Sequence, residues 1–300
     1  MMRWLFLFLS EQKGMRKWME TSPAAQKLTR RFVAGETLED ELAACARLAA
    51  NKTFSTLDHL GENVTSLAEA EASRDAYLSA LEEIHKRALP STVSIKLTQF
   101  GLDLSAEACF RNVLALAKRA SAAGTRIEID MESSEYTDRT LAIVEKIATA
   151  RAVIQAYLYR SAADIERLNA LEIPVRLCKG AYNEPASAAF PAKRDVDRNY
   201  LALMKTLLDK GTYPAIASHD ETILGEAFRY ARERKIAAEN FEFQMLYGIR
   251  NDLQQRIIDL GYRLRVYVPY GAAWYPYFMR RLAERPANAL FLARNIFKGN

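Results

Sequence analysis

Short apolar or β-branched segments alternate with longer amphipathic segments along most of this chain, and no other feature limits its possible folds as much. A strand that is followed by a helix and then by another strand is usually parallel to it, because the helix carries the chain back across the sheet. The pattern therefore predicts an α/β fold with a parallel sheet. The predicted strands span residues 53–58, 93–97, 126–130, 153–158, 174–178, 214–218, 241–246 and 264–268.

The segments between these strands have helical periodicity. In residues 110–117, for example, apolar side chains recur three and four positions apart. Gly124, Gly211 and Gly261 each stand between a helical segment and the next strand. A helix commonly ends in a left-handed residue, and glycine adopts that conformation without a steric cost, so we expect these glycines to end helices.

Parallel strands in this number can close into a (βα)8 barrel or stay open as a doubly wound sheet. The 300-residue chain contains no long linker, low-complexity tract or break in composition that would divide it. Single barrels commonly have this length, so we expect an α/β TIM-like (βα)8 barrel over residues 51–300. The preceding residues 1–50 have helical periodicity and are predicted to form an N-terminal helical segment.

Composition excludes several classes of protein. Lys and Arg number 42 against 37 Asp and Glu, and the two signs are interleaved, so the net charge of +5 forms no basic patch for nucleic acid. Cys45, Cys109 and Cys178 are far apart and lack metal-ligand spacing, so we expect a reduced, cytoplasmic protein without a zinc site. Asp195 and Asp197 resemble half of a metal motif, but at a helix start they are better explained as a complement to the helix dipole.

An apolar run at residues 4–9 is followed almost directly by Glu11. The run is too short for the apolar region of a signal peptide, and no small-residue cleavage site follows it. We expect it either to begin a helix that covers part of the barrel or to contact a membrane surface. No segment approaches the roughly 20 apolar residues that span a bilayer.

Polar residues stand at the carboxyl ends of the predicted strands, where a barrel builds its site. Lys96 is the most informative of them, because its amine would point into the barrel mouth and would need a carboxylate partner or an anionic ligand. Asp130, at the end of the next strand, is a candidate for that partner. The polar residues in such positions are Asp58, Lys96, Asp130, Gln155, Arg176, Lys179, His219, Asp220 and Tyr267.

The common nucleotide and hydrolase motifs, namely GxG, the P-loop, HExxH and GxSxG, do not occur in the sequence. The densest pattern lies near the C-terminus, where Arg280 and Arg281 follow Tyr275 and Tyr277. Long guanidinium side chains on neighbouring positions can converge on one carboxylate. The aromatic residues beside them indicate a lined pocket rather than a solvated helix face.

Taken in order, these segments resemble the proline dehydrogenase family, including the proline-oxidising domain of the bifunctional proline utilisation enzymes. The resemblance covers about residues 53 to 298. It rests on LDHLGE at 57–62, SIKLT at 94–98, IDM at 129–131, QAYL at 155–158, RLCKGAY at 176–182, ASHD at 217–220, FQMLYG at 243–248, and the stretch that contains Tyr277, Arg280 and Arg281.

This resemblance implies a distorted barrel, a final helix over the barrel mouth, and a non-covalent FAD across the strand ends. It also implies oxidation of L-proline to Δ1-pyrroline-5-carboxylate, the first step of proline catabolism, by hydride transfer from the ring to flavin N5. Substrate contacts are implied for Glu62, Lys96, Asp130, Leu246, Tyr267, Tyr277, Arg280 and Arg281. Cofactor contacts are implied for Asp130, Met131, Gln155, Arg176, Lys179, Gly180, Ala181, Tyr182, Ser218, His219 and Glu284.

The resemblance further implies partners and a gate. Electrons are expected to pass to a quinone, which would bring a cytoplasmic protein to the inner face of the membrane as a peripheral contact. With no aldehyde dehydrogenase domain in the sequence, we expect a monofunctional enzyme. Glu62, just past the first strand, and Arg281 are expected to pair and close the site when proline binds. No oligomeric state and no adenosine-end contacts around residues 192–196 are predicted.

Two other functions explain parts of the sequence. A Schiff-base enzyme would use Lys96 as a nucleophile toward a carbonyl, but it leaves the aromatic and arginine residues near the C-terminus unexplained. A basic interaction protein would use Arg280 and Arg281 to bind an acidic partner, but it leaves the ordered polar residues at the strand ends unexplained.

Overall fold

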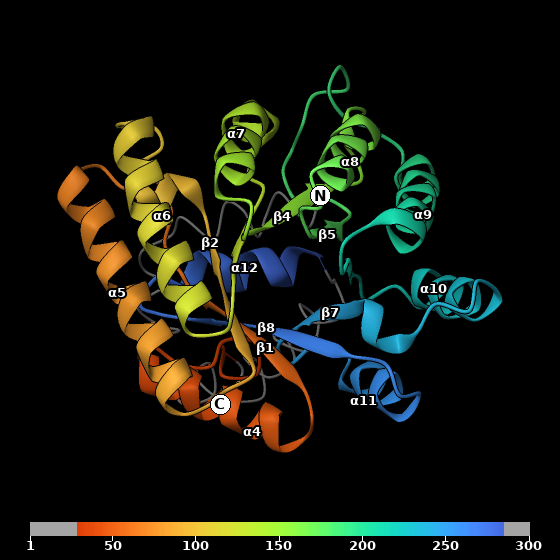
Figure 1. The fold of residues 1–300 in the computed structure, drawn as a ribbon, viewed down its shortest axis with the longest axis horizontal. Coiled ribbons are helices and arrows are strands. Elements are labelled where there is room, and N and C mark those ends of the chain that lie inside the picture. The colour runs from red at the N-terminus through yellow and green to blue at the C-terminus, as the bar shows by residue number, and fades with distance from the viewer. Residues whose placement is uncertain (1–28, 285–300) are drawn as a thin grey trace, which may run out of the picture.

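The structure, a computed structural model, describes residues 29–284. Its strands form a closed barrel in which each strand pairs in parallel with the next one and β8 pairs with β1 (Figure 1). The predicted barrel is therefore confirmed, and the open doubly wound sheet is wrong. The strands are β1 (Phe54–His59), β2 (Ser91–Ile95), β3 (Ile127–Ile129), β4 (Arg151–Gln155), β5 (Val175–Cys178), β6 (Ala215–Ala217), β7 (Glu242–Leu246) and β8 (Leu264–Tyr270).

Helices surround the barrel, and their apolar faces belong to the same core as the outward-facing strand residues (Figure 1). The helix before β1 begins with a capping box in which Thr37 and Asp40 satisfy each other's backbone N–H groups. The helices are α4 (Leu38–Ala50), α5 (Leu67–Lys86), α6 (Ala106–Ala122), α7 (Thr137–Ile147), α8 (Ser161–Ala170), α9 (Lys193–Lys210), α10 (Glu221–Glu233), α11 (Asn251–Asp259) and α12 (Trp274–Glu284), with 3-10 turns η1 (Leu97–Phe100), η2 (Ser134–Tyr136) and η3 (Ala238–Asn240).

The three glycines that were expected to end helices do so in different ways. Gly124 and Gly261 have φ angles of +70° and +80°, the left-handed conformation that the sequence predicts. Gly211 ends α9 with φ of −80°, so the prediction of a left-handed residue is wrong there. A Cβ atom on Gly211 would lie 2.6 Å from the carbonyl oxygen of Leu207, so close backbone approach, not handedness, explains this glycine.

Strand β2 ends two residues earlier than predicted, at Ile95 instead of Leu97. Lys96 follows the strand and caps η1, and its carbonyl accepts the N–H of Gln99 over 3.0 Å. The sequence prediction that placed Lys96 within the strand is therefore wrong, because the chain turns into η1 as soon as it leaves the barrel. The turn leaves the amine at the barrel mouth, where the residue pattern placed it.

The barrel is distorted where β1 and β2 approach the mouth. Their regular pairing ends at Leu57 and Val93. Beyond it the hydroxyl of Tyr77, from α5, accepts the N–H of His59 over 3.0 Å and donates to the carbonyl of Ser94 over 2.7 Å. The inserted hydroxyl replaces a direct ladder bond, so the strands separate at this point without leaving these two backbone groups unsatisfied.

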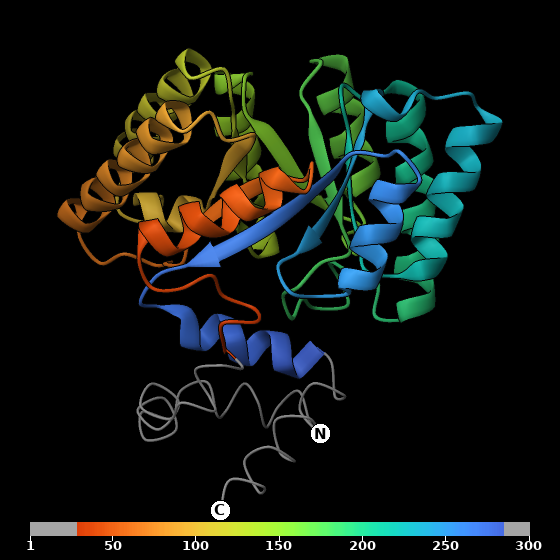
Figure 2. The same cartoon turned by 90° about the horizontal axis from the view of Figure 1, so that it is seen from below.

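Helix α12, the last helix of the described residues, lies over the end of the barrel to which the strand arrows point (Figure 2). This is the position expected for a helix near the C-terminus. A short segment before α4 packs against α12, where Phe32 and Val33 share an apolar cluster with Trp274 and Phe278. The N–H of Ala34 donates to the carbonyl of Pro269 at the end of β8 over 2.9 Å. The mouth is therefore covered by two segments from opposite ends of the described chain.

Several predictions fall on residues 1–28 and 285–300, which lie outside the described residues. They include the apolar run at residues 4–9 and most of the predicted N-terminal helical segment. Among the helices in residues 29–284, none is long and apolar enough to cross a membrane.

Candidate active site

The amine of Lys96 lies between the buried carboxylate of Asp58 and the partly buried carboxylate of Asp130 at the mouth of the barrel. Its Nζ atom is 3.3 Å from Asp58 Oδ1 and 3.3 Å from Asp130 Oδ2. These residues stand at the ends of the neighbouring strands β1, β2 and β3, so their side chains meet at one edge of the mouth. The structure brings Lys96 and Asp130 together as expected and adds Asp58 as a second partner.

Burial and charge act in opposite directions on these groups. Burial alone would lower the pKa of Lys96, but Asp58 and Asp130 outweigh it and raise this pKa well above its ordinary value. Burial alone would raise the pKa of Asp130, but Lys96 and Arg176 lower it. The pKa of Asp58 is raised, because burial and repulsion from Asp130 exceed the effect of Lys96. Lys96 is therefore a protonated cation held by both Asp58 and Asp130.

Arg176 of β5 holds the other oxygen of Asp130. Its Nη1 atom donates to Asp130 Oδ1 over 2.7 Å, and the hydroxyl of Ser94 donates to the same oxygen over 2.8 Å. The hydroxyl of Tyr267 donates to Asp130 Oδ2 over 2.9 Å, and the Arg176 guanidinium carbon lies 5.4 Å from the centre of the Tyr267 ring. Asp130 is therefore the shared acceptor that positions Lys96, Arg176 and Tyr267.

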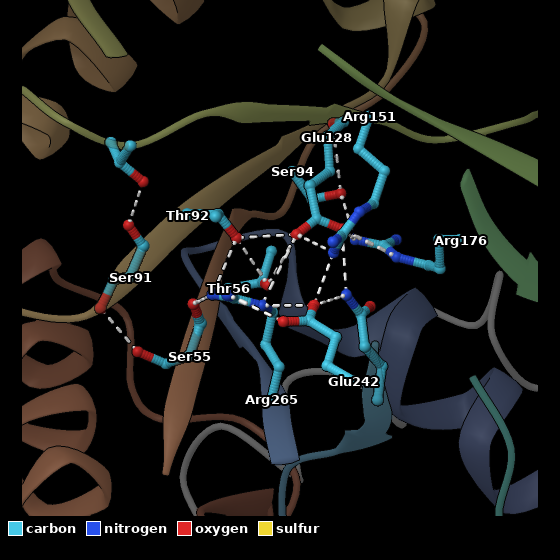
Figure 3. Close-up of polar contacts among 12 residues, drawn as sticks. Ser55, Thr56, Ser91, Thr92, Ser94, Glu128, Arg151, Arg176, Glu242 and Arg265 are labelled. Atoms are coloured by element: carbon cyan, nitrogen blue, oxygen red, sulfur yellow. Dashed lines mark hydrogen bonds and ion pairs between the residues drawn. The ribbon is translucent and has the colours of Figure 1, made fainter. Parts of the chain in front are cut away.

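Farther from the mouth the barrel interior is filled with charged side chains (Figure 3). We call Glu128, Arg151, Arg176, Glu242 and Arg265 the core ionic network. Arg176 Nε donates to Glu128 Oε2 over 3.0 Å, and Arg151 Nη1 lies 2.5 Å from Glu242 Oε1. Arg265 Nε lies 2.8 Å from Glu242 Oε1. Arg176 belongs both to this network and to the mouth, so it joins the two.

Both carboxylates of the network are fully buried. An unpaired buried charge is costly, so pairing with several arginines is required for these carboxylates to remain ionised. Burial alone would raise the pKa of Glu128, but Arg176, Arg151 and Arg265 together lower it. The pKa of Glu242 is lowered in the same way, mainly by Arg265 and Arg151. Removing any one arginine would leave a carboxylate undercompensated.

Glu128 and Arg265, with their partners Arg151 and Glu242, are not among the site residues predicted from the sequence. A signal was available, because side chains of a strand alternate between its two faces. Glu128 is two residues before Asp130 and therefore faces the interior with it. A charged residue at such a position indicates an ionic barrel interior, but its partner lies on another strand.

Polar contacts tie the loops after β3, β4 and β5 together. Gln155 Nε2 donates to the carbonyl of Glu132 over 2.9 Å, and Gln155 Oε1 accepts the N–H of Ala181 over 3.3 Å. Gly180 has φ of +122°, and a Cβ atom there would lie 2.4 Å from the ring of Tyr157. The loop after β5 is therefore held against the end of β4, and only glycine permits this approach.

Lys179 lies at the amino ends of α9 and α10. Its Nζ atom is 2.5 Å from Asp197 Oδ1 and 2.9 Å from Asp220 Oδ2. His219 Nε2 accepts the N–H of Leu246 over 2.9 Å and joins the ends of β6 and β7. These expected cofactor residues thus surround the mouth on the side opposite β1 to β3 in the strand order.

Other expected site residues line the mouth or support it. Leu246 packs against the apolar cluster that contains Tyr277 of α12. Met131 and Ser218 are buried. Burial and the charge of Glu132 raise the pKa of Tyr182, and Lys96 and Asp130 also act on it, so this hydroxyl lies within electrostatic reach of the mouth.

Glu62 follows β1 and is half-buried. Burial is the main reason why the pKa of Glu132 is raised, and the negative charge of Glu62 raises this pKa further. The backbone of α12 carries Arg280, Arg281 and Glu284 over the mouth, but their side chains lie outside the described part of the structure. The expected pairing of Glu62 with Arg281 is therefore not tested by the geometry.

The site can bind and orient an anionic ligand near a cation. A Schiff-base lysine attacks as a neutral amine, whereas Asp58 and Asp130 raise the pKa of Lys96 and keep the amine protonated. This geometry opposes the Schiff-base alternative. In residues 29–284, no His, Cys, Asp and Glu side chains are grouped as metal ligands would be.

Comparison with known proteins gives a consistent result. Residues 42–294 match the family described as "Proline dehydrogenase". "Proline dehydrogenase 1" of Bacillus subtilis (strain 168) is 42% identical over 305 residues, which cover 99% of this chain and 100% of that protein. "Proline dehydrogenase" of Deinococcus radiodurans is 39% identical over 281 residues, which cover 91% of each.

A solved structure agrees with the fold. Proline utilization A (PutA) from Bdellovibrio bacteriovorus, inactivated by N-propargylglycine, matches with a TM-score of 0.83 and 25% sequence identity. The match covers 94% of this chain but 36% of the PutA chain, so this chain corresponds to about a third of that larger protein.

The contacts of Lys96 predict how its removal changes stability with pH. In Lys96→Met, Asp58 and Asp130 face each other without the amine, so the folded-state pKa of Asp58, already raised, rises further above the unfolded value of about 4, and Asp130 loses the main charge that lowers its pKa. Such a group stabilises the fold at low pH, and this stabilisation is lost as pH rises through the raised pKa. We therefore expect the loss of unfolding free energy relative to wild type, about 3–5 kcal/mol for a broken buried pair, to be larger at pH 8 than at pH 5.

Urea unfolding at both pH values measures this difference. Lys86→Met is the control, because Lys86 is largely exposed and pairs with Glu83 on the surface of α5. An equal loss at the two pH values for Lys96→Met, or a similar trend in the control, would contradict the assigned pairing.

Proposed function

Because this chain belongs to the proline dehydrogenase family, we propose that it oxidises L-proline to Δ1-pyrroline-5-carboxylate, the first step of proline catabolism, with a non-covalent FAD as the electron acceptor. The observation that carries the proposal is the pair of cations, Lys96 and Arg176, held on either side of Asp130 at the barrel mouth. One cation is suited to a substrate carboxylate and the other to a polar ring atom of a cofactor.

The residues present fit a flavin dinucleotide. Flavin ring nitrogens and carbonyls require N–H donors, and Arg176 retains one N–H on Nη1 after its bonds to Glu128, Ser94 and Asp130. A diphosphate requires cations or backbone N–H groups. Lys179 follows β5 beside the fixed loop at Gly180, and its amine contacts Asp197 of α9. We assign the cofactor to Asp130, Met131, Gln155, Arg176, Lys179, Gly180, Ala181, Tyr182, Ser218, His219 and Glu284.

When bound, the flavin supplies a hydride acceptor at N5, and its electrons then go to a quinone. The chain therefore needs no catalytic triad and must mainly bind and orient proline. We assign the proline carboxylate to Lys96, Arg280 and Arg281, and the ring to Leu246, Tyr267 and Tyr277. Fixing the carboxylate at one end of so small a substrate also fixes the position of its ring.

The aromatic and aliphatic cover of the mouth supports this assignment. Trp274, Tyr275 and Phe278 of α12 pack with Phe32 of the preceding segment into one buried cluster. Such a cover excludes water from a reacting centre and strengthens the charge interactions inside it. We also propose that transfer of electrons to a quinone occurs at the inner face of the membrane, with the protein in the cytoplasm and in peripheral contact.

The cofactor assignment is tested with the purified protein. We expect it to be yellow, to release FAD on denaturation, and to lose its visible flavin absorption when L-proline is added without oxygen. D-proline serves as the control ligand, because it places the same groups in the mirror arrangement. A colourless protein that gains no flavin spectrum when FAD is added would rule out the proposed cofactor and with it the proposed activity.

The carboxylate assignment predicts the effect of Arg280→Ala. A hydrogen bond to a charged group is worth about 1.5–3 kcal/mol, so kcat/KM for proline should fall by about tenfold to a hundredfold, mainly through KM. The flavin spectrum should persist. Arg256→Ala on the exposed face of α11 is the control. A wild-type KM in Arg280→Ala would remove Arg280 from the substrate site.

We further propose that Glu62 and Arg281 form the gate over bound proline. An exposed pair is worth only about 0–1 kcal/mol, so proline must favour the closed arrangement by drawing Arg281 inward. Glu62→Ala should slow flavin reduction or weaken proline binding, and its effect should be non-additive with Arg281→Ala, because both remove the same contact. A double-mutant cycle on the rate of flavin reduction measures this. Strict additivity would mean that the two residues act separately.

A further inference from the structure

We propose that Glu128 is a positioning residue for proline oxidation. It fixes the guanidinium of Arg176 so that the edge with an uncommitted N–H is presented to the barrel mouth. The inference rests on the proposed function, because Arg176 is assigned there to the cofactor. It concerns a residue that contacts neither the proposed cofactor nor the substrate and acts only through Arg176.

Arg176 donates two hydrogen bonds from one edge of its guanidinium to a single carboxylate oxygen of Glu128 (Figure 3). Arg176 Nε and Nη2 both donate to Glu128 Oε2, over 3.0 Å and 2.5 Å. Paired charge-assisted bonds of this kind fix the orientation of a guanidinium plane as well as its position. Arg176 is almost completely buried and Glu128 is completely buried, so water does not compete for either group.

The donors of Arg176 are almost all used. A guanidinium has five N–H groups. Glu128 accepts two of them, Ser94 accepts one on Nη2 over 3.3 Å, and Asp130 accepts one on Nη1 over 2.7 Å. The remaining N–H is therefore on Nη1. Asp130 follows Glu128 by two residues at the end of β3 and lies closer to the mouth. Nη1, which is bonded to Asp130, is therefore the nitrogen on the edge of the guanidinium nearer the mouth.

Asp130 alone would not fix this orientation. It also accepts from Lys96 over 3.3 Å and from Tyr267 over 2.9 Å, and Arg176 makes only one bond to it. A single bond leaves a long arginine side chain free to rotate about it, whereas the two bonds to Glu128 fix the opposite edge of the plane. Without Glu128, both Nη atoms could turn toward Asp130.

Glu128 is itself fixed by hydrogen bonds from residues other than Arg176. Its Oε1 atom accepts from Thr92 over 2.9 Å and from Arg151 over 3.4 Å, and its Oε2 atom also accepts from Gln244 over 3.3 Å. Arg151 continues to Glu242, which has no bond to Arg176. The position of Arg176 thus depends directly on Glu128 and only indirectly on Glu242.

This difference provides a matched pair of variants, Glu128→Gln and Glu242→Gln. Each removes one negative charge from the same buried network and keeps the side-chain size, but only the first weakens the two bonds to Arg176. We expect Glu128→Gln to slow flavin reduction by proline on the order of tenfold to a hundredfold with FAD still bound. We expect Glu242→Gln to stay within about threefold of wild type.

The pH profile is a second readout, which a purely structural role would not change. Arg176 is one of the charges that lower the pKa of Asp130. In Glu128→Gln a neighbouring negative charge is lost and both Nη atoms of Arg176 turn toward Asp130, so this pKa should fall further, and the acidic limb of the flavin-reduction profile should move to lower pH. In Glu242→Gln the acidic limb should stay where it is in wild type.

A third readout does not depend on proline. The visible absorption spectrum of bound FAD reports the groups beside the flavin ring, so it should change in Glu128→Gln and not in Glu242→Gln. If wild type binds FAD but proline does not reduce it, the proposed function fails while this spectral comparison still tests the role of Glu128.

Equal losses in both variants would overturn the inference, because they would show that the charge of the network matters and not its contact with Arg176. A wild-type rate, spectrum and pH profile in Glu128→Gln would overturn it as well. If Glu128→Gln does not fold, Glu128→Asp replaces it, because the shorter carboxylate keeps the charge but cannot keep both bonds at their present lengths. The same slower reduction and changed spectrum are then expected, and wild-type behaviour in Glu128→Asp would contradict the role.

Discussion

The carboxylate of Glu128 contacts arginines from three other strands, Arg151 of β4, Arg176 of β5 and Arg265 of β8. A buried carboxylate is tolerated only when such partners surround it, and these partners reach it only when the strands form a closed barrel. The internal charge is therefore compensated only when the barrel is closed. Most barrels of this type fill their interior with branched aliphatic side chains. Here a polar interior continues upward without interruption into the polar mouth.

The mouth depends on that continuity. Arg176 receives its orientation from Glu128 on one edge and holds Asp130 with the other. Asp130 in turn holds Lys96, and Asp58 supports the same amine from β1. Charges of opposite sign thus alternate from the interior to the mouth, and each neutralises the next. Such an arrangement keeps two cations in fixed positions beneath a cover of aromatic side chains, which suits the proposed reaction, in which the protein would bind and orient the substrate and a bound cofactor would supply the redox chemistry.

Much of this could be predicted from the sequence, because the relevant signals are local. Strand and helix alternate with clear periods, and Lys96, Asp130 and Arg176 stand at strand ends where a barrel builds its site. Other features could not be predicted. Lys96 lies just beyond its strand because η1 begins there, and Gly211 is required by a close carbonyl rather than by its φ angle. The insertion of a hydroxyl from α5 between β1 and β2 has no sequence pattern at all.

The sequence by itself determined the order of the elements, the faces of the strands and the residue types at the strand ends, because these follow from periods of two and 3.6 residues. Only the tertiary structure decided which charges meet. Arg176 and Glu128 are 48 residues apart, and Tyr267 and Asp130 are 137 residues apart. Hydrogen bonds and buried ion pairs weaken when the distance between their atoms changes by a few tenths of an ångström. Those interatomic distances are set by the register of neighbouring strands and by barrel closure. Local periodicity carries no information on either, so the partners of each charge emerge only when the barrel is complete.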